Sequence, residues 1–268
     1  MLSLRRGYLL AEALCALALA GALAATAAAA LIGAQRALRA GEERERAGRA
    51  ERETIAVLRA ALEGGHVLAL RGDTAVDLDL AIAVAPICAV GSRAILLPPA
   101  KVADGAPLTS ALQAPGVDDV AAIRVADDPR ATPTWVEYIV DSVQTRSVTG
   151  VCDASDGWAG VADAAAPRWR LVLRDTLPAD LEPGATVRVG RPGRFTLYHA
   201  GRGEWMLGWR RCSTDFAICG VVQPVAGPLR MPAAGGLRIR ELAAPARWEI
   251  EARGAGSRQD VARATVYR

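Results

Sequence analysis

Residues 5–12 read Arg-Arg-Gly-Tyr-Leu-Leu-Ala-Glu and open an apolar run that continues to about Gly33. Between Tyr8 and Gly33 the only charged side chain is Glu12. A helix needs roughly 20 apolar residues to cross a bilayer, so this run is long enough to span one. An ionisable residue inside such a run is costly, by about 2.5–3.5 kcal/mol for Asp, Lys or Arg at the helix centre, and normally has a partner. Glu12 is therefore a candidate functional residue.

These residues resemble the processing signal of type IV pilins and of the pseudopilins of type II secretion systems. In that family a short basic leader ends in glycine, the next residue is usually phenylalanine, and glutamate follows at the fifth position of the mature chain. Gly7, Tyr8 and Glu12 stand at the matching places, although Tyr8 replaces phenylalanine and Ala11 replaces a common large aliphatic residue. The resemblance implies that a prepilin peptidase cuts after Gly7 and N-methylates Tyr8. It covers about residues 1–35, and beyond them the similarity is one of architecture.

Cleavage after Gly7 would create a positive amine one helical turn from Glu12. Opposite charges attract strongly where the effective dielectric constant is low. We therefore expect Glu12 to pair with the N-terminal ammonium of a neighbouring subunit, or of its own chain, so that the buried charge is tolerated only inside an assembly.

Two other N-terminal signals fit the sequence less well. A secretory signal peptide has the same basic start, apolar middle and small-residue exit, and Ala25-Thr26-Ala27 could serve as that exit. Glu12 and the helical pattern beyond the exit argue against this interpretation. A lipoprotein signal requires a small residue before the modified cysteine, but Leu14 precedes Cys15.

The two arginines before the apolar run favour an orientation with the N-terminus in the cytoplasm. We therefore expect a single span in a bacterial inner membrane, with the C-terminal part in the periplasm before assembly into a pilus or pseudopilus. The expected division is a leader at 1–7, a transmembrane and assembly half-helix at 8–34, a periplasmic half-helix at 35–64, and a periplasmic β domain at 65–268.

The helix is expected to continue to about Leu62, because residues 34–62 contain no proline and Gly64-Gly65 is a clear stop. After Gly65 the pattern changes to short β-like segments separated by turn residues. The predicted strands are 67–70, 76–84, 94–97, 121–125, 134–141, 168–174, 186–189, 195–199, 204–210, 221–225, 235–241, 248–252 and 261–267.

Short turns such as the one at 201–203 predict antiparallel pairing of neighbouring strands. So many strands favour two sheets, or one strongly bent sheet. Residues 98–115 and 151–167 are predicted loops. The expected fold class is α+β and pilin-like, with a long N-terminal helix, transmembrane in its first half, followed by an antiparallel strand-rich domain.

The five cysteines divide into one and four. Cys15 lies in the apolar run and is a small apolar residue there. The other four lie in the domain expected outside the cytoplasm, where an even number indicates two disulfides with three possible connectivities. We favour Cys212–Cys219 as a short local loop, which leaves Cys88–Cys152 as the long link.

The sequence shows no catalytic motif. His66 and His199 are isolated, no paired Cys-x-x-Cys spacing accompanies them, and Asp153, Asp156 and Gly157 are too loosely spaced for a calcium loop. The net charge of +3 is small, and no basic run with interleaved aromatics indicates nucleic-acid binding. We therefore predict a protein that is not an enzyme and that has no cofactor and no metal site.

The expected function is that of a minor pilin or pseudopilin, a structural subunit of a type IV pilus or a type II secretion pseudopilus. Its expected partners are other pilin or pseudopilin subunits, the prepilin peptidase and, before assembly, inner-membrane lipid. Two alternatives stay open: a single-pass, membrane-anchored periplasmic binding or adhesion module, and a secreted hydrolase, for which no residues are found.

Overall fold

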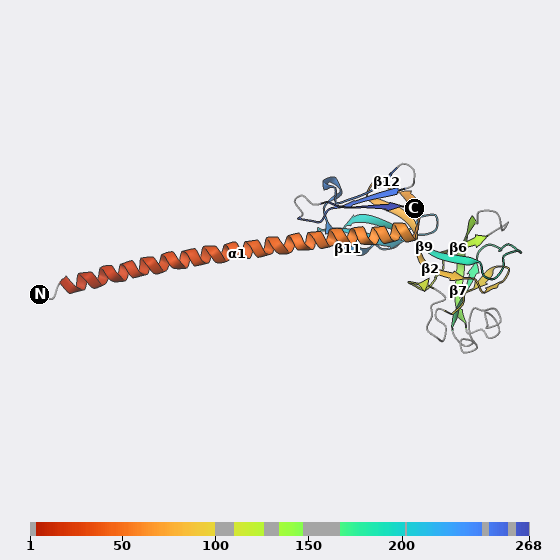
Figure 1. Ribbon diagram of the computed structural model, residues 1–268, viewed down its shortest axis with the longest axis horizontal. Helices are drawn as coiled ribbons and strands as arrows, with labels where there is room; N and C mark the ends of the chain where they lie inside the picture. The colour runs from red at the N-terminus through yellow and green to blue at the C-terminus, as the bar shows by residue number, and fades with distance from the viewer. Residues whose placement is uncertain are drawn as a thin grey trace.

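The computed structural model describes residues 4–99, 110–125, 134–146, 167–201, 203–242, 247–256 and 261–267, and of residues 4–11 and 146 the backbone alone. In these residues a single long helix, α1 (Leu4–Gly64), is followed by an antiparallel, strand-rich domain with two sheets. Figure 1 shows the helix projecting far beyond that domain, with the C-terminus beside the base of the helix. The expected order of one long helix and then antiparallel strands is confirmed.

Helix α1 begins earlier and ends later than the sequence predicts. It starts at Leu4, inside the expected leader, because leucine and arginine are good helix formers and no proline interrupts the segment. It ends at Gly64, and the amide of Gly65 donates to the carbonyl of Ala61 over 2.8 Å. A Cβ on Gly65 would lie 2.6 Å from that carbonyl oxygen, so glycine allows the tight turn into the first strand.

The larger sheet has eleven strands in the order β1-β2-β9-β6-β7-β8-β4-β3, with β10 pairing β9 and β11, and β5 pairing β2. The smaller sheet has the order β12-β13-β14. All the pairings are antiparallel, as predicted. The strands are β1 (His66–Leu70), β2 (Ala75–Pro86), β3 (Ala89–Val90), β4 (Ala94–Leu96), β5 (Ser110–Ala111), β6 (Val120–Val125), β7 (Thr134–Arg146), β8 (Arg168–Leu173), β9 (Thr186–His199), β10 (Trp205–Arg211), β11 (Gln223–Leu229), β12 (Leu237–Leu242), β13 (Arg247–Ala252) and β14 (Ala262–Tyr267).

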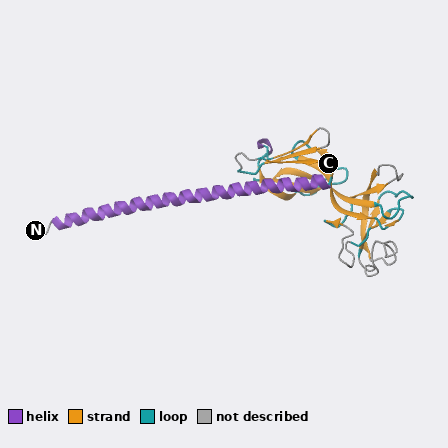
Figure 2. Ribbon diagram, in the orientation of Figure 1, coloured by secondary structure: helices purple, strands orange, loops and turns teal. Residues whose placement is uncertain are grey.

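The β domain has two large hydrophobic cores. In the helix lobe, the end of α1 packs with the first half of β2, the second half of β9 and strands β10–β14. In the distal lobe, the second half of β2 and the first half of β9 pack with β4, β6, β7 and β8. Figure 2 shows the two groups of strands, one around the base of the helix and one beyond its end. The antiparallel ribbon of β2 and β9 therefore runs through both lobes.

The last third of α1 is part of the helix-lobe core. Ala47, Ala50 and Leu58 are buried, and this part of the helix packs against β11, β13, β14 and β2. The buried carboxylate of Glu51 accepts a hydrogen bond from the amide of Gly254, just beyond β13, over 2.8 Å. Small side chains at positions 47 and 50 let the sheet approach the helix backbone closely.

Two predicted strands, 186–189 and 195–199, form the single strand β9, so the prediction of a break between them is wrong. Pro192 lies between the part of β9 that pairs with β6 and the part that pairs with β10. Its carbonyl accepts from the amide of Cys212, one residue past the end of β10, so the missing N–H faces the end of that ladder, where proline is tolerated. Strand β7 also runs five residues past its predicted end, and β3 and β5 lie where no strand was predicted.

The cysteines follow the predicted pattern where the structure describes them. Cys212 and Cys219 form a disulfide that closes a short loop after β10, which confirms the local pairing. Cys88 is also disulfide-bonded. Its predicted partner, Cys152, lies outside the described residues, as does most of the predicted loop 151–167.

Candidate functional site

The first feature with functional implications is the long exposed part of α1. From Glu12 to Arg46 nearly every side chain is exposed, and the apolar ones lie on all sides of the helix. A helix that is apolar all round is normally covered by other helices or by lipid. It is the one helix in the described residues that is long and apolar enough to cross a membrane. The exposed large aliphatic residues are Leu14, Leu17, Leu19, Leu23, Leu31, Ile32 and Leu38.

The residues of the resembled signal lie in the first turns of this helix. Gly7 and Tyr8 are helical, and Glu12 follows one turn later with an exposed side chain. Cys15, also exposed, is a free thiol on the same stretch. Nothing in the described chain covers Glu12, so any partner for its charge has to come from outside these residues.

The second feature is a layer of buried acids on the face of β2 opposite the helix-lobe core. Val76 and Leu78 point into that core, whereas Asp77 and Asp79 alternate with them and point the other way. Asp77 is 1% exposed and accepts hydrogen bonds from Arg194 and Arg71. Burial raises the pKa of the Asp77 carboxyl, but the two guanidinium groups outweigh it, so the pKa lies below its usual range.

A second buried acid, Asp119, holds the two lobes together immediately before β6. Its carboxylate is fully buried and accepts from Arg191 Nε over 3.0 Å, from another Arg191 nitrogen over 2.9 Å and from Arg211 over 3.1 Å. The amide of Gly116 adds a fourth hydrogen bond of 2.7 Å. Because Arg191 lies on β9 and Arg211 ends β10, this one carboxylate joins both strands to the segment before β6.

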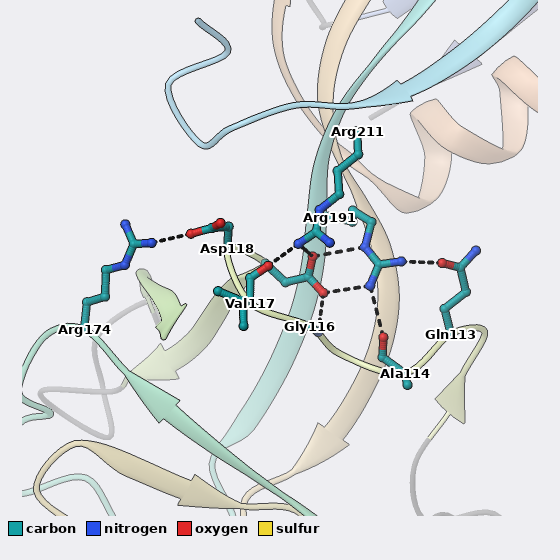
Figure 3. Close-up of polar contacts among 9 residues, drawn as sticks. Gln113, Ala114, Gly116, Val117, Asp118, Arg174, Arg191 and Arg211 are labelled. Atoms are coloured by element: carbon teal, nitrogen blue, oxygen red, sulfur yellow. Dashed lines mark hydrogen bonds and ion pairs between the residues drawn. The ribbon is translucent and has the colours of Figure 1, made fainter. Parts of the chain in front are cut away.

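The same arginines fix the rest of that segment, as Figure 3 shows. Arg191 also donates to the side chain of Gln113 and to the carbonyl of Ala114, and Arg211 donates to the carbonyl of Val117. Next to the cluster, Asp118 pairs with Arg174, but both of those side chains are about half exposed. The neighbouring residues Asp118 and Asp119 therefore form ion pairs in different environments, the first at the surface and the second in the interior.

The third buried acid, Asp79, follows Asp77 on the same face of β2 and has no arginine partner in the residues that the structure describes. Its side chain is 8% exposed, and its Oδ1 has no hydrogen-bond partner in the described part of the chain. Burial raises the pKa of the Asp79 carboxyl to about 7, and the negative charges of Glu137 and Asp119 add to this effect. A buried carboxyl without a counter-ion is costly to ionise, which is the physical cause of the shift.

Asp79 lines a cavity of about 390 Å³ at the junction of the two lobes. His66, its partner in the β1–β2 register, and Glu137, from β7, line the same cavity. His66 Nδ1 lies 3.3 Å from Glu137 Oε1. Gly190 also lines the cavity, and a Cβ there would lie 3.0 Å from the Cβ of Asp79, which is a tight contact.

An aromatic side chain and a cation complete the cavity wall. Trp135 comes from β7, and Arg188 comes from β9. The guanidinium carbon of Arg188 lies 5.1 Å from the centroid of the Trp135 ring, a cation–π contact. In the described residues Arg188 forms no ion pair with either cavity carboxylate, so its charge does not replace the arginine that Asp79 lacks.

The Asp79 carboxyl is expected to make stability fall as pH rises. Its pKa is about 7 in the folded chain and about 3.9 when unfolded, so between these values the folded state holds a proton that the unfolded state lacks. The free energy of unfolding therefore decreases between about pH 4 and 7, by up to about 4 kcal/mol. The charged groups facing Asp79 across the cavity are His66, Glu137 and Arg188.

Thermal unfolding from pH 5 to pH 8, in buffer with a chelator, measures this effect. The Asp79→Asn variant should gain stability relative to the unchanged chain as pH rises, because it removes the ionisation. An equal pH dependence of the two proteins would show that Asp79 ionises freely.

The sequence prediction placed His66 and His199 alike as isolated residues. The structure separates them: His66 lies in the cavity, while His199 is exposed at the end of β9 with its ring 5.3 Å from that of Trp205. A β1–β2 hairpin predicts that His66 faces a residue of β2, but no local signal brings Glu137 to them. The possible calcium-loop residues Asp153, Asp156 and Gly157 lie outside the described residues.

Comparisons of the chain with protein-family models, with curated proteins and with solved structures gave no match.

Proposed function

We propose that the chain is a minor pilin-like or pseudopilin-like subunit that assembles through the exposed part of α1. The observation that carries this proposal is that one continuous helix has an exposed part and a part buried in the folded domain. Residues 12–46 are exposed and apolar for most of their length, while the last third is built into the core of the helix lobe. Such a helix presents a long apolar rod whose base is held firmly by a folded domain.

The processing signal at the start of the rod supports the same role. Gly7, Tyr8 and Glu12 match the resembled family at the positions for cleavage, the new N-terminus and the buried acid. A membrane or a helix bundle would place Glu12 in a medium of low dielectric constant, where its charge needs a partner. The N-terminal ammonium of a neighbouring subunit, or of its own chain, is that partner.

In this role the two lobes supply the exposed surface that determines which partner subunits are recognised. Helices rich in alanine and glycine associate by close packing, which gives little selectivity between partners. The β domain, held at the end of α1, therefore carries the surface by which one subunit is distinguished from another. No turnover of a substrate is part of this role.

Mass spectrometry of the mature N-terminus, with the full chain isolated from its native cells, tests the first step. A chain that begins with N-methylated Tyr8 supports the proposal, and Gly7→Val should abolish that species. A chain that begins near Ala28 would point to a secreted protein, and an intact Met1 to a plain membrane anchor. Either of these results would overturn the proposal.

Site-specific photo-cross-linking tests the second step. A photoreactive residue at Leu19 should cross-link to other subunits that carry an apolar N-terminal helix, and Glu12→Leu should remove those adducts while cleavage after Gly7 persists. The control position is Leu112, which is exposed on the β domain. Adducts with lipid alone would contradict assembly through the helix.

A further inference from the structure

The cavity at the junction of the lobes contains the donors of a metal site. One donor atom from each of His66, Asp79 and Glu137 lies within 4.8 Å of the others. His66 and Asp79 face each other across the β1–β2 hairpin, whereas Glu137 comes from β7, more than fifty residues later in the sequence. The cluster therefore results from the fold and not from a local motif, which is why the sequence predicted no metal site.

The environment of Asp79 points to a missing cation. Three aspartates are buried in the described residues, and two of them, Asp77 and Asp119, are each held by two arginines. Asp79 is more than nine-tenths buried, and its Oδ1, which has no partner in the described residues, belongs to a side chain lining the cavity. Buried charges in proteins are paired or coordinate a metal.

We propose that His66, Asp79 and Glu137 bind one divalent transition-metal ion of the zinc type. Two carboxylates and one neutral imidazole balance the charge of a divalent ion. An imidazole nitrogen among the donors favours zinc and similar ions over calcium and magnesium, which prefer oxygen ligands only.

The geometry of the donors fits this ion after small side-chain rotations. Zinc bonds of about 2.0–2.2 Å hold tetrahedral ligands about 3.3–3.5 Å apart, and His66 Nδ1 and Glu137 Oε1 are already 3.3 Å apart. The widest separation in the cluster is at most 4.8 Å and has to close by a little over 1 Å. Glu137 can move for this purpose, because its side chain is about half exposed.

The site has access to solvent and an open coordination position. The side chains of His66 and Glu137 are 42% and 49% exposed, so an ion reaches the buried Asp79 between them. Three protein ligands leave a fourth position of a tetrahedral site for water or for a donor from another molecule. The bound ion would tie β1, which follows directly from α1, to β7 of the distal lobe.

Metal binding by the full chain in detergent tests the proposal, with Cys15→Ser in every protein to remove the free thiol. After treatment with a chelator, zinc is titrated by calorimetry, and the absorption spectrum of the cobalt(II) form reports the ligand geometry. One ion per chain is expected. Affinity should fall at least about ten-fold in each of His66→Gln, Asp79→Asn and Glu137→Gln.

The matched control is His199→Gln, which removes the chain's other histidine and should leave the affinity unchanged. Near-ultraviolet circular dichroism of the metal-free variants checks that each is folded, and Glu137→Gln, at a half-exposed position, is the variant least able to disturb the fold.

No saturable zinc binding, or equal binding by the unchanged chain and by His66→Gln, would overturn the proposal. Displacement of zinc by an equal concentration of calcium would also overturn it. None of these outcomes bears on cleavage after Gly7. The experiments can therefore overturn the metal-site proposal without affecting the proposed role in assembly.

Discussion

Replacing Gly254 with alanine is expected to detach the base of α1 from the helix lobe and to cost about 2–6 kcal/mol of stability. A Cβ at this position would lie 2.4 Å from the carbonyl oxygen of Ala47 and 2.7 Å from its Cα. These are backbone atoms of the helix, so a side-chain rotation cannot relieve the clash, and overpacking of this kind costs about 1–3 kcal/mol. Moving Gly254 away also removes the donor of the buried Glu51 carboxylate, at a further cost of about 1–3 kcal/mol.

Two measurements check this prediction. The midpoint of thermal unfolding should fall by roughly 10 °C, given about 2–4 °C per kcal/mol for a domain of this size. Limited trypsin digestion should cut more readily at Arg49 and Arg52, which lie where the helix meets the lobe. Because the clash is with the backbone, adding Ala47→Gly should not restore stability.

The control is Gly91→Ala, in the turn between β3 and β4. A Cβ there would lie 3.5 Å from the nearest atom, the carbonyl oxygen of Ala94, which is an ordinary contact. This variant should stay close to the unchanged chain. A Gly254→Ala protein with the same midpoint as Gly91→Ala would contradict the docking of the helix described above.

Asp119→Asn is expected to destabilise the junction of the lobes by about 3–5 kcal/mol, the usual result of removing one partner from a buried ion pair. The Asp119 carboxylate accepts four hydrogen bonds, from Arg191, Arg211 and Gly116. An amide at this position turns one acceptor into a donor that faces other donors. Arg191, which is 17% exposed, is then left without its counter-charge.

The neighbouring residue provides a matched control, Asp118→Asn. Asp118 pairs with Arg174, but both side chains are about half exposed, and such pairs contribute about 0–1 kcal/mol. Asparagine also tolerates the left-handed backbone at this position, where φ is 63°. Denaturant unfolding followed by tryptophan fluorescence should therefore separate the two variants by at least about 2 kcal/mol. Equal losses would show that the Asp119 cluster is no stronger than a surface ion pair.

The sequence predicts the helix and most strands because their signals are local. Proline-free alanine-rich sequence defines α1, and the glycine pair Gly64-Gly65 marks its end at Gly64. Alternating apolar residues define strands such as β8 and β13, and the short spacing of Cys212 and Cys219 anticipates their disulfide.

The division into two lobes and the cavity between them are not predictable in this way. They depend on which distant strands pair, and that choice is made by packing and not by local pattern. Pro192 illustrates the difference, because its effect on β9 is decided by the gap between β6 and β10 on one side of the strand. The polar layer is similar: Asp77, Asp79 and Asp119 look alike in the sequence, and only the fold determines which two receive arginines.

The ribbon of β2 and β9 has a mechanical consequence if the chain is held by the exposed part of α1. Tension applied between the exposed end of α1 and the distal lobe runs along these two strands, whose backbones continue without a break from one core to the other. Because each strand belongs to both cores, the pull is shared between the two backbones, and the ladder between them is irregular only between Ala81 and Ala83. The two lobes are therefore joined by a pair of hydrogen-bonded strands that belong to both cores, and not by a single connecting loop.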